Sequence, residues 1–213
     1  MMDIDRIARR ELARVRRRDE ALRTGRGRPD MLCLNQMSGF GGIAVTRTFA
    51  RWNPSDKSAG VTLSNENRTG SYTNHTNNVR ATIGKQTGKW YYEFTIDAIG
   101  AACAVNTGVW ALSTAIDTYI DGTSGVYRFW AGGPLLAAND VVRTKMDMDA
   151  GQMSVAINGG VFQTVNFTVG GVDWYPVIGD DNASSQTVTY TANFGATTFA
   201  YSVPSGYNAG LYV

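Results

Sequence analysis

The clearest alternation of hydrophobic and polar residues lies between residues 142 and 157. In residues 142–148, one valine and two methionines fall on one side of an extended chain, and arginine, lysine and aspartate fall on the other. This period of two predicts a strand with one buried face. A second alternating run, 152–157, is framed by turn signals at 149–151 and 158–160. The pattern therefore predicts a β-meander.

Short strands and turns are predicted throughout residues 50–213. In residues 90–97 large apolar side chains alternate with other residues, so we expect one core face made of Trp90, Tyr92, Phe94 and Ile96. Further strands are expected at residues 61–63, 79–83, 105–112, 161–169, 174–178 and 187–193. Residues 52–56 are predicted to form a turn, and Pro176 is predicted to lie at a sheet edge or bulge. Residues 65–78 are almost wholly polar, and His75 among them is expected in an exposed loop or at a strand edge. The 24 glycines and the low share of charged residues, 18%, are typical of a turn-rich β-sandwich.

Residues 1–30 have a different pattern, with apolar residues at spacings of three and four that predict a helix over residues 3–24. The apolar stripe consists of Ile4, Ala8, Leu12, Val15 and Leu22. A single helix of this length is marginally stable in water, so we expect it to dock on another protein. The connector, residues 31–49, carries Met37 and Phe40 and is expected to pack along a partner surface.

Charge is distributed unevenly along the chain. Residues 1–30 hold ten arginines and six acidic residues, a net charge of +4, whereas the remainder has ten basic and twelve acidic residues, a net of −2. Nucleic-acid contact is therefore possible only for the N-terminal segment, through side chains such as Arg14 and Arg17. Arginine also pairs well at protein interfaces, so protein docking is the favoured interpretation, and a loosely ordered tail is the third. No apolar run approaches the roughly 20 residues of a membrane span.

A cluster of aromatic residues among turn residues lies within residues 113–139. Binding residues are often carried by loops on a rigid scaffold. Aromatic faces suit the apolar face of a sugar, and a carboxylate suits its hydroxyl groups. The candidate ligand-binding residues are Tyr119, Asp121, Tyr127 and Trp130. The alternative is that these aromatic side chains simply pack beneath the loops.

Reactive chemistry is sparse in the sequence. His75 is the only histidine and has no metal-ligand spacing around it, and the glycines near Lys85 lack the phosphate-loop spacing. Residues 180–182 lack the spacing of a calcium loop. Asp147 and Asp149 would share one strand face about 7 Å apart, a separation that overlaps the geometry of an inverting glycosidase, but Asp149 is already explained by its turn. We expect no catalytic activity, no cofactor and no metal.

Four blocks of sequence resemble SPRY domains. One block is Met146–Gly151 with Ser154 and Asn158-Gly159. The other three are residues 88–93 upstream of it and residues 174–178 and 192–195 downstream, which is the order that the family requires. The resemblance covers residues 50–213 and implies a bent sandwich of two antiparallel sheets that binds partners through loops at one end. The sequence departs from the family at residues 142–145, where an apolar run is usual. We therefore expect that part of one sheet face to be solvated or covered by a neighbour.

Two further segments look like parts of bacteriophage tail proteins: residues 34–40, and residues 199–212 as the C-terminal segment of their SPRY domains. The resulting prediction is a basic anchor helix (1–30), a connector (31–49) and an all-β SPRY-like sandwich (50–213) in a non-enzymatic virion protein, assembled in the host cytoplasm and located in the tail. The expected partners are other virion proteins, further copies of the chain and a host surface glycan or protein. The alternatives are a purely architectural capsid or tail subunit and a cellular peptide-binding SPRY adaptor.

Overall fold

The structure, a computed structural model, describes residues 46–73, 77–100, 103, 105–118, 120, 125–129, 136–179 and 187–213. Within it, Arg47–Val213 form one compact unit. The predicted anchor helix lies outside the described residues, together with its candidate interface residues Ile4, Ala8, Leu12, Arg14, Val15, Arg17 and Leu22. Met37 and Phe40 of the connector lie outside them as well. These assignments stay predictions.

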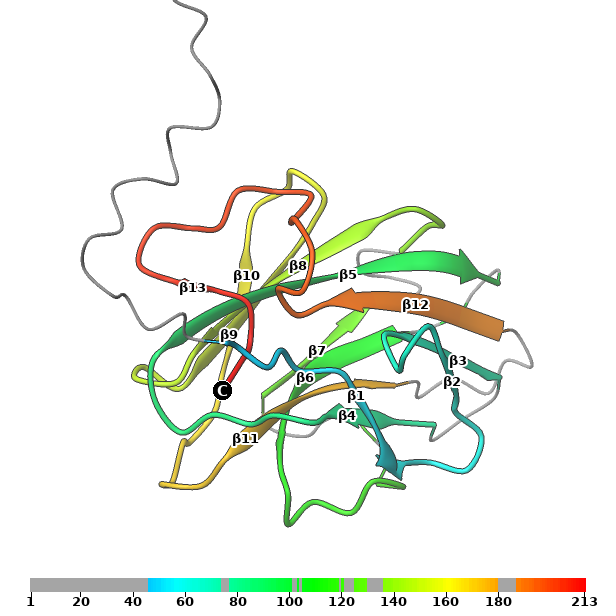
Figure 1. Cartoon of the computed structure of the whole chain (residues 1–213), viewed down its shortest axis with the longest axis horizontal. Coiled ribbons are helices and arrows are strands. Elements are labelled where there is room, and N and C mark those ends of the chain that lie inside the picture. Colours follow the sequence, from blue (N-terminus) through cyan, green and yellow to red (C-terminus); the bar gives the residue numbers. More distant parts are fainter. Residues whose placement is uncertain are drawn as a thin grey trace, which may run out of the picture. The chain divides into compact units, whose positions relative to one another are not determined.

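The described strands form two sheets that pack face to face (Figure 1). The five-stranded sheet has the order β1 (Trp52–Lys57), β4 (Val79–Ala81), β11 (Trp174–Gly179), β6 (Val105–Ala111) and β7 (Val126–Phe129). The other sheet has the order β10 (Gln163–Asn166), β9 (Gln152–Ile157), β8 (Val141–Asp147), β5 (Lys89–Ile99), β12 (Thr187–Asn193), β3 (Thr69–Thr73) and β2 (Thr62–Ser64), and its eighth strand, β13 (Asn208–Ala209), pairs with β5. The β13–β5 pair is parallel, and the other pairs are antiparallel. The predicted all-β two-sheet sandwich is thus confirmed for the described residues.

The predicted meander is formed by β8, β9 and β10. Met146 pairs with Met153 across the first turn, and Val155 pairs with Gln163 across the second. Gly151 has a φ of 64°, the left-handed conformation that its turn requires. Val142, Met146 and Met153 are fully buried, so the face predicted from the alternation is the core face.

The core lies between the two sheets and is rich in aromatic side chains. Trp52 packs edge-on against Tyr190 and Phe194, with ring centroids 5.6 and 5.2 Å apart. Tyr92 and Phe94 belong to the same cluster. The core face predicted for residues 90–97 is confirmed, with Trp90 only partly buried at its rim. Each fully buried aromatic side chain contributes on the order of 2–3 kcal/mol through the area it removes from water.

The structure corrects or refines three local expectations. Residues 52–56 belong to β1 and not to a turn, and this edge strand tolerates Pro54. The polar segment 65–78 contains β3, which Tyr72 holds in place by inserting into the core. Pro176 lies in the interior strand β11 and pairs with Val109 of β6. On the other side the pairing is interrupted between Trp174 and Val177, so the predicted edge-or-bulge position is correct in part.

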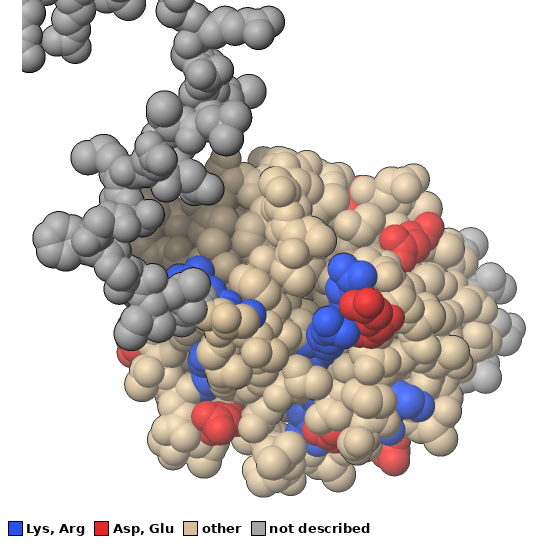
Figure 2. Space-filling model, in the orientation of Figure 1, with Lys and Arg blue, Asp and Glu red and all other residues tan. Residues whose placement is uncertain are grey.

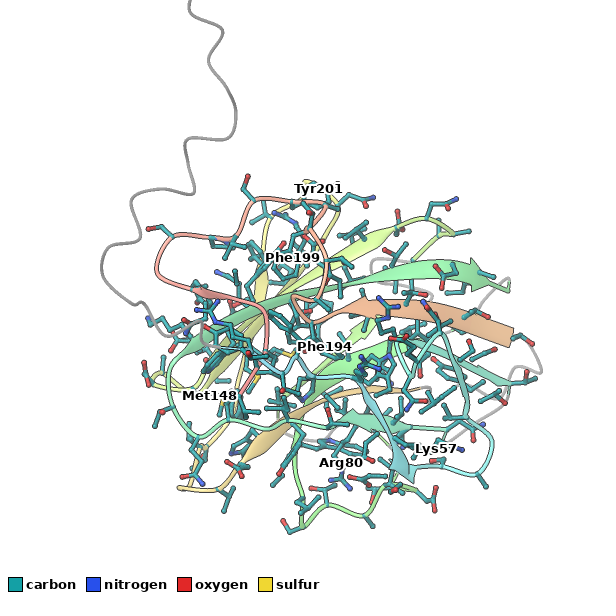
Figure 3. The ribbon with its side chains drawn as sticks, in the orientation of Figure 1. Lys57, Arg80, Met148, Phe194, Phe199 and Tyr201 are labelled. Carbon is teal, nitrogen blue, oxygen red and sulfur yellow. The ribbon has the colours of Figure 1, made fainter. Side chains whose placement is uncertain are left out.

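Part of the outer face of the eight-stranded sheet, over β5 and β8, is covered by residues 195–207, which we call the C-terminal strap (Figure 3). The Phe199 ring packs edge-on against Tyr91, with centroids 5.1 Å apart. Glu93, beside Tyr91 on the outer face, is only 3% exposed. The alternation in residues 90–97 therefore does not cleanly separate a buried face from a solvated one, because Tyr91 and Glu93 on the second face are buried as well, while Asp97 stays exposed.

The strap also contacts residues 142–145, where the sequence lacks the apolar run that is usual in the family. Arg143 lies between the rings of Phe162 and Tyr201, 4.7 and 4.9 Å from their centroids. Lys145 lies 4.3 Å from the Phe162 centroid. Both side chains stay partly exposed, and aromatic side chains of the same chain stack on their cations.

The two ends of the compact unit meet in a short antiparallel pairing. Thr48 and Val213 exchange two backbone hydrogen bonds, of 3.0 and 3.1 Å. Close by, Gly195 and Gly210 both have positive φ, and a Cβ atom on Gly210 would lie 2.4 Å from the Phe194 carbonyl oxygen. Only glycine fits this crossing without displacing the backbone. The expectation that the C-terminal tail is ordered is confirmed.

Candidate functional site

Of the four predicted ligand-binding residues, Tyr127 is the one that the structure describes. It lies on β7, at the edge of the five-stranded sheet. Tyr119, Asp121 and Trp130 lie outside the described residues, so whether the four side chains converge is a prediction that stays open.

Tyr127 lines a groove of about 400 Å³. The opposite wall comes from β9 and from the turn that leads into β10, with Val155, Ile157 and Val161 as its apolar residues. Val161 is 82% exposed, an unusual exposure for a valine. The groove therefore opens between β7 and the β9–β10 hairpin, which belong to different sheets.

Tyr127 contributes to the hydrophobic core as well as to the groove. Its side chain is partly buried and also packs against the main core, so the alternative expectation that it packs beneath the loops is correct in part. The side chain of Tyr127 thus contacts the core and also lines the groove, where an aromatic ring can provide apolar contact area to a ligand.

The two carboxylates considered for glycoside cleavage are occupied by structural contacts. Asp147 accepts hydrogen bonds from Lys89 at 2.8 Å and from the Ala150 backbone at 3.0 Å. Asp149 accepts one from the Gly88 backbone at 2.8 Å. Burial alone would raise the pKa of Asp147, but the hydrogen bonds from Lys89 and the turn backbone outweigh it, so the net pKa lies below its ordinary value. These contacts tie the β8–β9 turn to the start of β5.

Charged side chains on the face shown in Figure 2 are interspersed among uncharged residues, and acidic and basic groups lie next to one another. In the described ranges we find no group of three His, Cys, Asp or Glu residues arranged to hold a metal ion. His75 and residues 180–182 lie outside these ranges. No helix long and apolar enough to cross a membrane occurs in the part of the chain that the structure describes.

Comparison with known proteins places the fold. No family model matches the chain, and no curated protein matches it. Among solved structures, the SPRY domain of human HERC1 matches with a TM-score of 0.55 at 15% identity, over 66% of this chain and 96% of that one. The PSpry domain of TRIM65 matches with a TM-score of 0.50 at 13% identity, over 68% of this chain and 92% of that one. The chain therefore has a SPRY-like fold, as the four sequence blocks indicate.

Sequence reasoning missed two features of the surface. One is the strap and its attachment to Glu93, whose partners lie more than a hundred residues away along the chain. The other is an array of hydroxyl groups on the outer face of β3 and β12. The alternating threonines of residues 187–191 were a readable signal for the second feature, because alternation places them on one face.

Proposed function

We propose that this chain is a non-enzymatic recognition subunit of a bacteriophage particle, and that its sandwich binds a host-surface glycan in the groove between Tyr127 and the β9–β10 hairpin. The observation that carries the proposal is the groove itself, with an anchored tyrosine on one wall and the exposed Val161 on the other. A concave, largely apolar site with a few polar groups, here Gln163, is the usual form of a small-ligand site.

The viral setting is supported by sequence alone. Residues 34–40 and 199–212 look like segments of phage tail proteins, and residues 1–30 have the composition of a docking helix. In this proposal the N-terminal helix and connector attach the chain to other virion proteins. The sandwich then faces outward, and further copies of the chain complete the oligomer.

The groove assignment can be tested with a matched pair of exposed valines. Val161 lines the groove and Val172, 45% exposed, does not. We expect Val161→Ser to weaken binding of the full chain to a glycan array, or to host cells, about tenfold. Val172→Ser should bind like the unchanged protein, and both variants should melt as it does, because neither valine is buried.

Equal binding by the two variants would contradict the groove assignment. If the unchanged chain binds no glycan and particles carrying Val161→Ser adsorb normally, the architectural alternative is favoured, in which the sandwich only decorates or joins neighbouring subunits.

A further inference from the structure

A second cavity, of about 330 Å³, lies on the outer face of the eight-stranded sheet against the C-terminal strap. Its floor is formed by β5 and β12, one wall by the turn between β2 and β3, and the other by the start of the strap. The polar side chains that line it include Asn65, Arg68, Thr95, Thr191, Thr197 and Thr198. The groove at Tyr127 shares none of its residues with this cavity.

Four threonines are among the residues that line the cavity, and their hydroxyl groups have hydrogen-bonding capacity to spare. In the described residues, the hydroxyls of Thr95, Thr197 and Thr198 make no hydrogen bond within the protein. Thr191 donates to Asp97 at 2.6 Å and lies 2.7 Å from the Thr69 hydroxyl. Each hydroxyl can donate one hydrogen bond and accept two, so the cavity can serve a ligand whose own groups both donate and accept.

The charged side chains at the cavity, Glu93 and Arg68, already interact with other groups of the protein. Both oxygens of Glu93 accept hydrogen bonds, from Tyr91, Ala200 and Tyr201. Arg68 donates to the backbone and side chain of Asn65 and lies 3.7 Å from Glu66. A strongly charged ligand would find no free counter-charge here, so the lining favours a neutral, polyhydroxylated one.

The topology disfavours an extended peptide as the occupant. A peptide that adds to a sheet needs an unpaired strand edge. Here β5 pairs with β8 and β12, and β12 pairs with β5 and β3. The cavity therefore offers side-chain groups rather than a backbone ladder, and this is the kind of surface that sugar hydroxyls can match.

The wall made by the strap is fixed before any ligand arrives. The Asn193 side chain accepts the Gly195 N–H at 3.0 Å and donates to the carbonyls of Thr197 and Thr198, both at 3.1 Å. Glu93 holds the backbone of Ala200 and Tyr201 through their N–H groups. Preorganisation of this kind lowers the entropic cost of binding.

The hydroxyl lining continues beyond the cavity. Across β3 and β12, Thr69 faces Thr191, Ser71 faces Thr189 and Thr73 faces Thr187, with side-chain oxygens 2.7, 3.2 and 2.8 Å apart. These residues form a ladder of paired hydroxyls that begins at the cavity. A chain of sugars leaving the cavity along β12 would therefore pass over polar groups of the same kind.

We infer that the cavity binds one residue of a neutral saccharide, whose chain extends along the hydroxyl ladder. The inference rests on the proposed function in one respect, that the sandwich is a saccharide-binding module. It names the chemical class of the ligand and adds a second position at which that ligand is held.

The test uses the full chain, labelled with ¹⁵N, and methyl glycosides of glucose, galactose, mannose and N-acetylglucosamine as probes. We expect saturable amide shifts at Thr95, Thr191 and Ala200 with at least one probe at millimolar concentrations. Thr95→Val and Thr198→Ala should each weaken that binding about tenfold, since each removes one hydrogen bond to the ligand. Thr168→Val, at an exposed position outside both the cavity and the hydroxyl ladder, is the matched control and should bind normally.

Two results would overturn the inference: no saturable shift at these amides with any of the four glycosides, or unchanged affinity in both Thr95→Val and the exposed strap variant Thr198→Ala. Shifts confined to the residues of the Tyr127 groove would also overturn it, while leaving the proposed function intact. Binding that survives Val161→Ser but is lost in Thr198→Ala would support the cavity and contradict the groove.

Discussion

The Glu93 carboxylate accepts a hydrogen bond from the Ala200 backbone N–H at 2.8 Å, across 107 residues of sequence. The other carboxylate oxygen accepts the Tyr201 N–H at 2.9 Å and the Tyr91 hydroxyl at 2.6 Å. One nearly buried acidic residue in β5 therefore fixes the strap that covers part of the outer face of the sheet. Because the strap forms part of the cavity wall, the same contact also sets the shape of that cavity.

Replacing Glu93 with glutamine should destabilise the fold. The amide group presents N–H donors where the carboxylate accepted hydrogen bonds, so at least one backbone N–H of the strap loses its partner in a buried position. We expect a loss of about 2 kcal/mol in the free energy of unfolding, measured by denaturant titration. Glu66→Gln, at a side chain that is 64% exposed, should change it by less than about 0.5 kcal/mol. Equal stability of the Glu93→Gln variant would contradict the fastening role.

Two buried tyrosines in contact should respond in opposite ways to loss of the hydroxyl. Tyr72 donates to the Gly179 carbonyl at 3.1 Å, whereas the hydroxyl of Tyr190 has no partner in the described part of the chain. Tyr72→Phe should therefore lose about 1 kcal/mol, and Tyr190→Phe should gain about 1 kcal/mol, in the free energy of unfolding. Thermal melting of the two variants measures both changes. Destabilisation by Tyr190→Phe would show that the hydroxyl is satisfied in solution.

The ion pair between Lys89 and Asp147 should make stability depend on pH in the acid range. The folded-state pKa of Asp147 lies below the ordinary value of 3.8, so the ionised carboxylate stabilises the fold above that pH. This contribution is lost as the pH falls through the lower folded-state pKa. We expect Asp147→Asn to melt at a lower temperature than the unchanged protein at pH 7, and the difference to shrink below pH 3.8. Asp117→Asn, at an exposed position, is the control and should melt like the unchanged protein at pH 7.

Two glycines of the C-terminal segment separate backbone strain from steric overlap. Gly206 has a φ of 82° and open space where a Cβ atom would lie, whereas Gly210 has a φ of 98° and lies against the Phe194 carbonyl oxygen. Gly206→Ala should cost about 1–2 kcal/mol, from the left-handed backbone alone. Gly210→Ala should cost about 3 kcal/mol or more, because the backbone must also move. Chemical denaturation compares them, and equal costs would contradict the close approach.

Much of the sandwich could be predicted from local sequence. Alternation in residues 142–157 and 90–97 indicates strands and their core faces, and turn chemistry marks where β8 and β9 end. These signals are local, because a strand's period and a turn's backbone depend on neighbouring residues. The binding role of Tyr127 stays a prediction: the sequence placed it among turn residues, whereas the structure has it on β7, beside a groove.

The tertiary structure decided what covers each face. Nothing near Glu93 in sequence indicates that it would be buried, because its partners Ala200 and Tyr201 come from the end of the chain. The same is true of Arg143, whose cation is covered by Phe162 and Tyr201. Burial of a sheet's second face depends on long-range packing, which alternation does not encode. The sequence by itself determined most of the strands, the turns of the meander and one core face; the strap, the partly buried second face and the cavity beside it followed only from how distant segments meet.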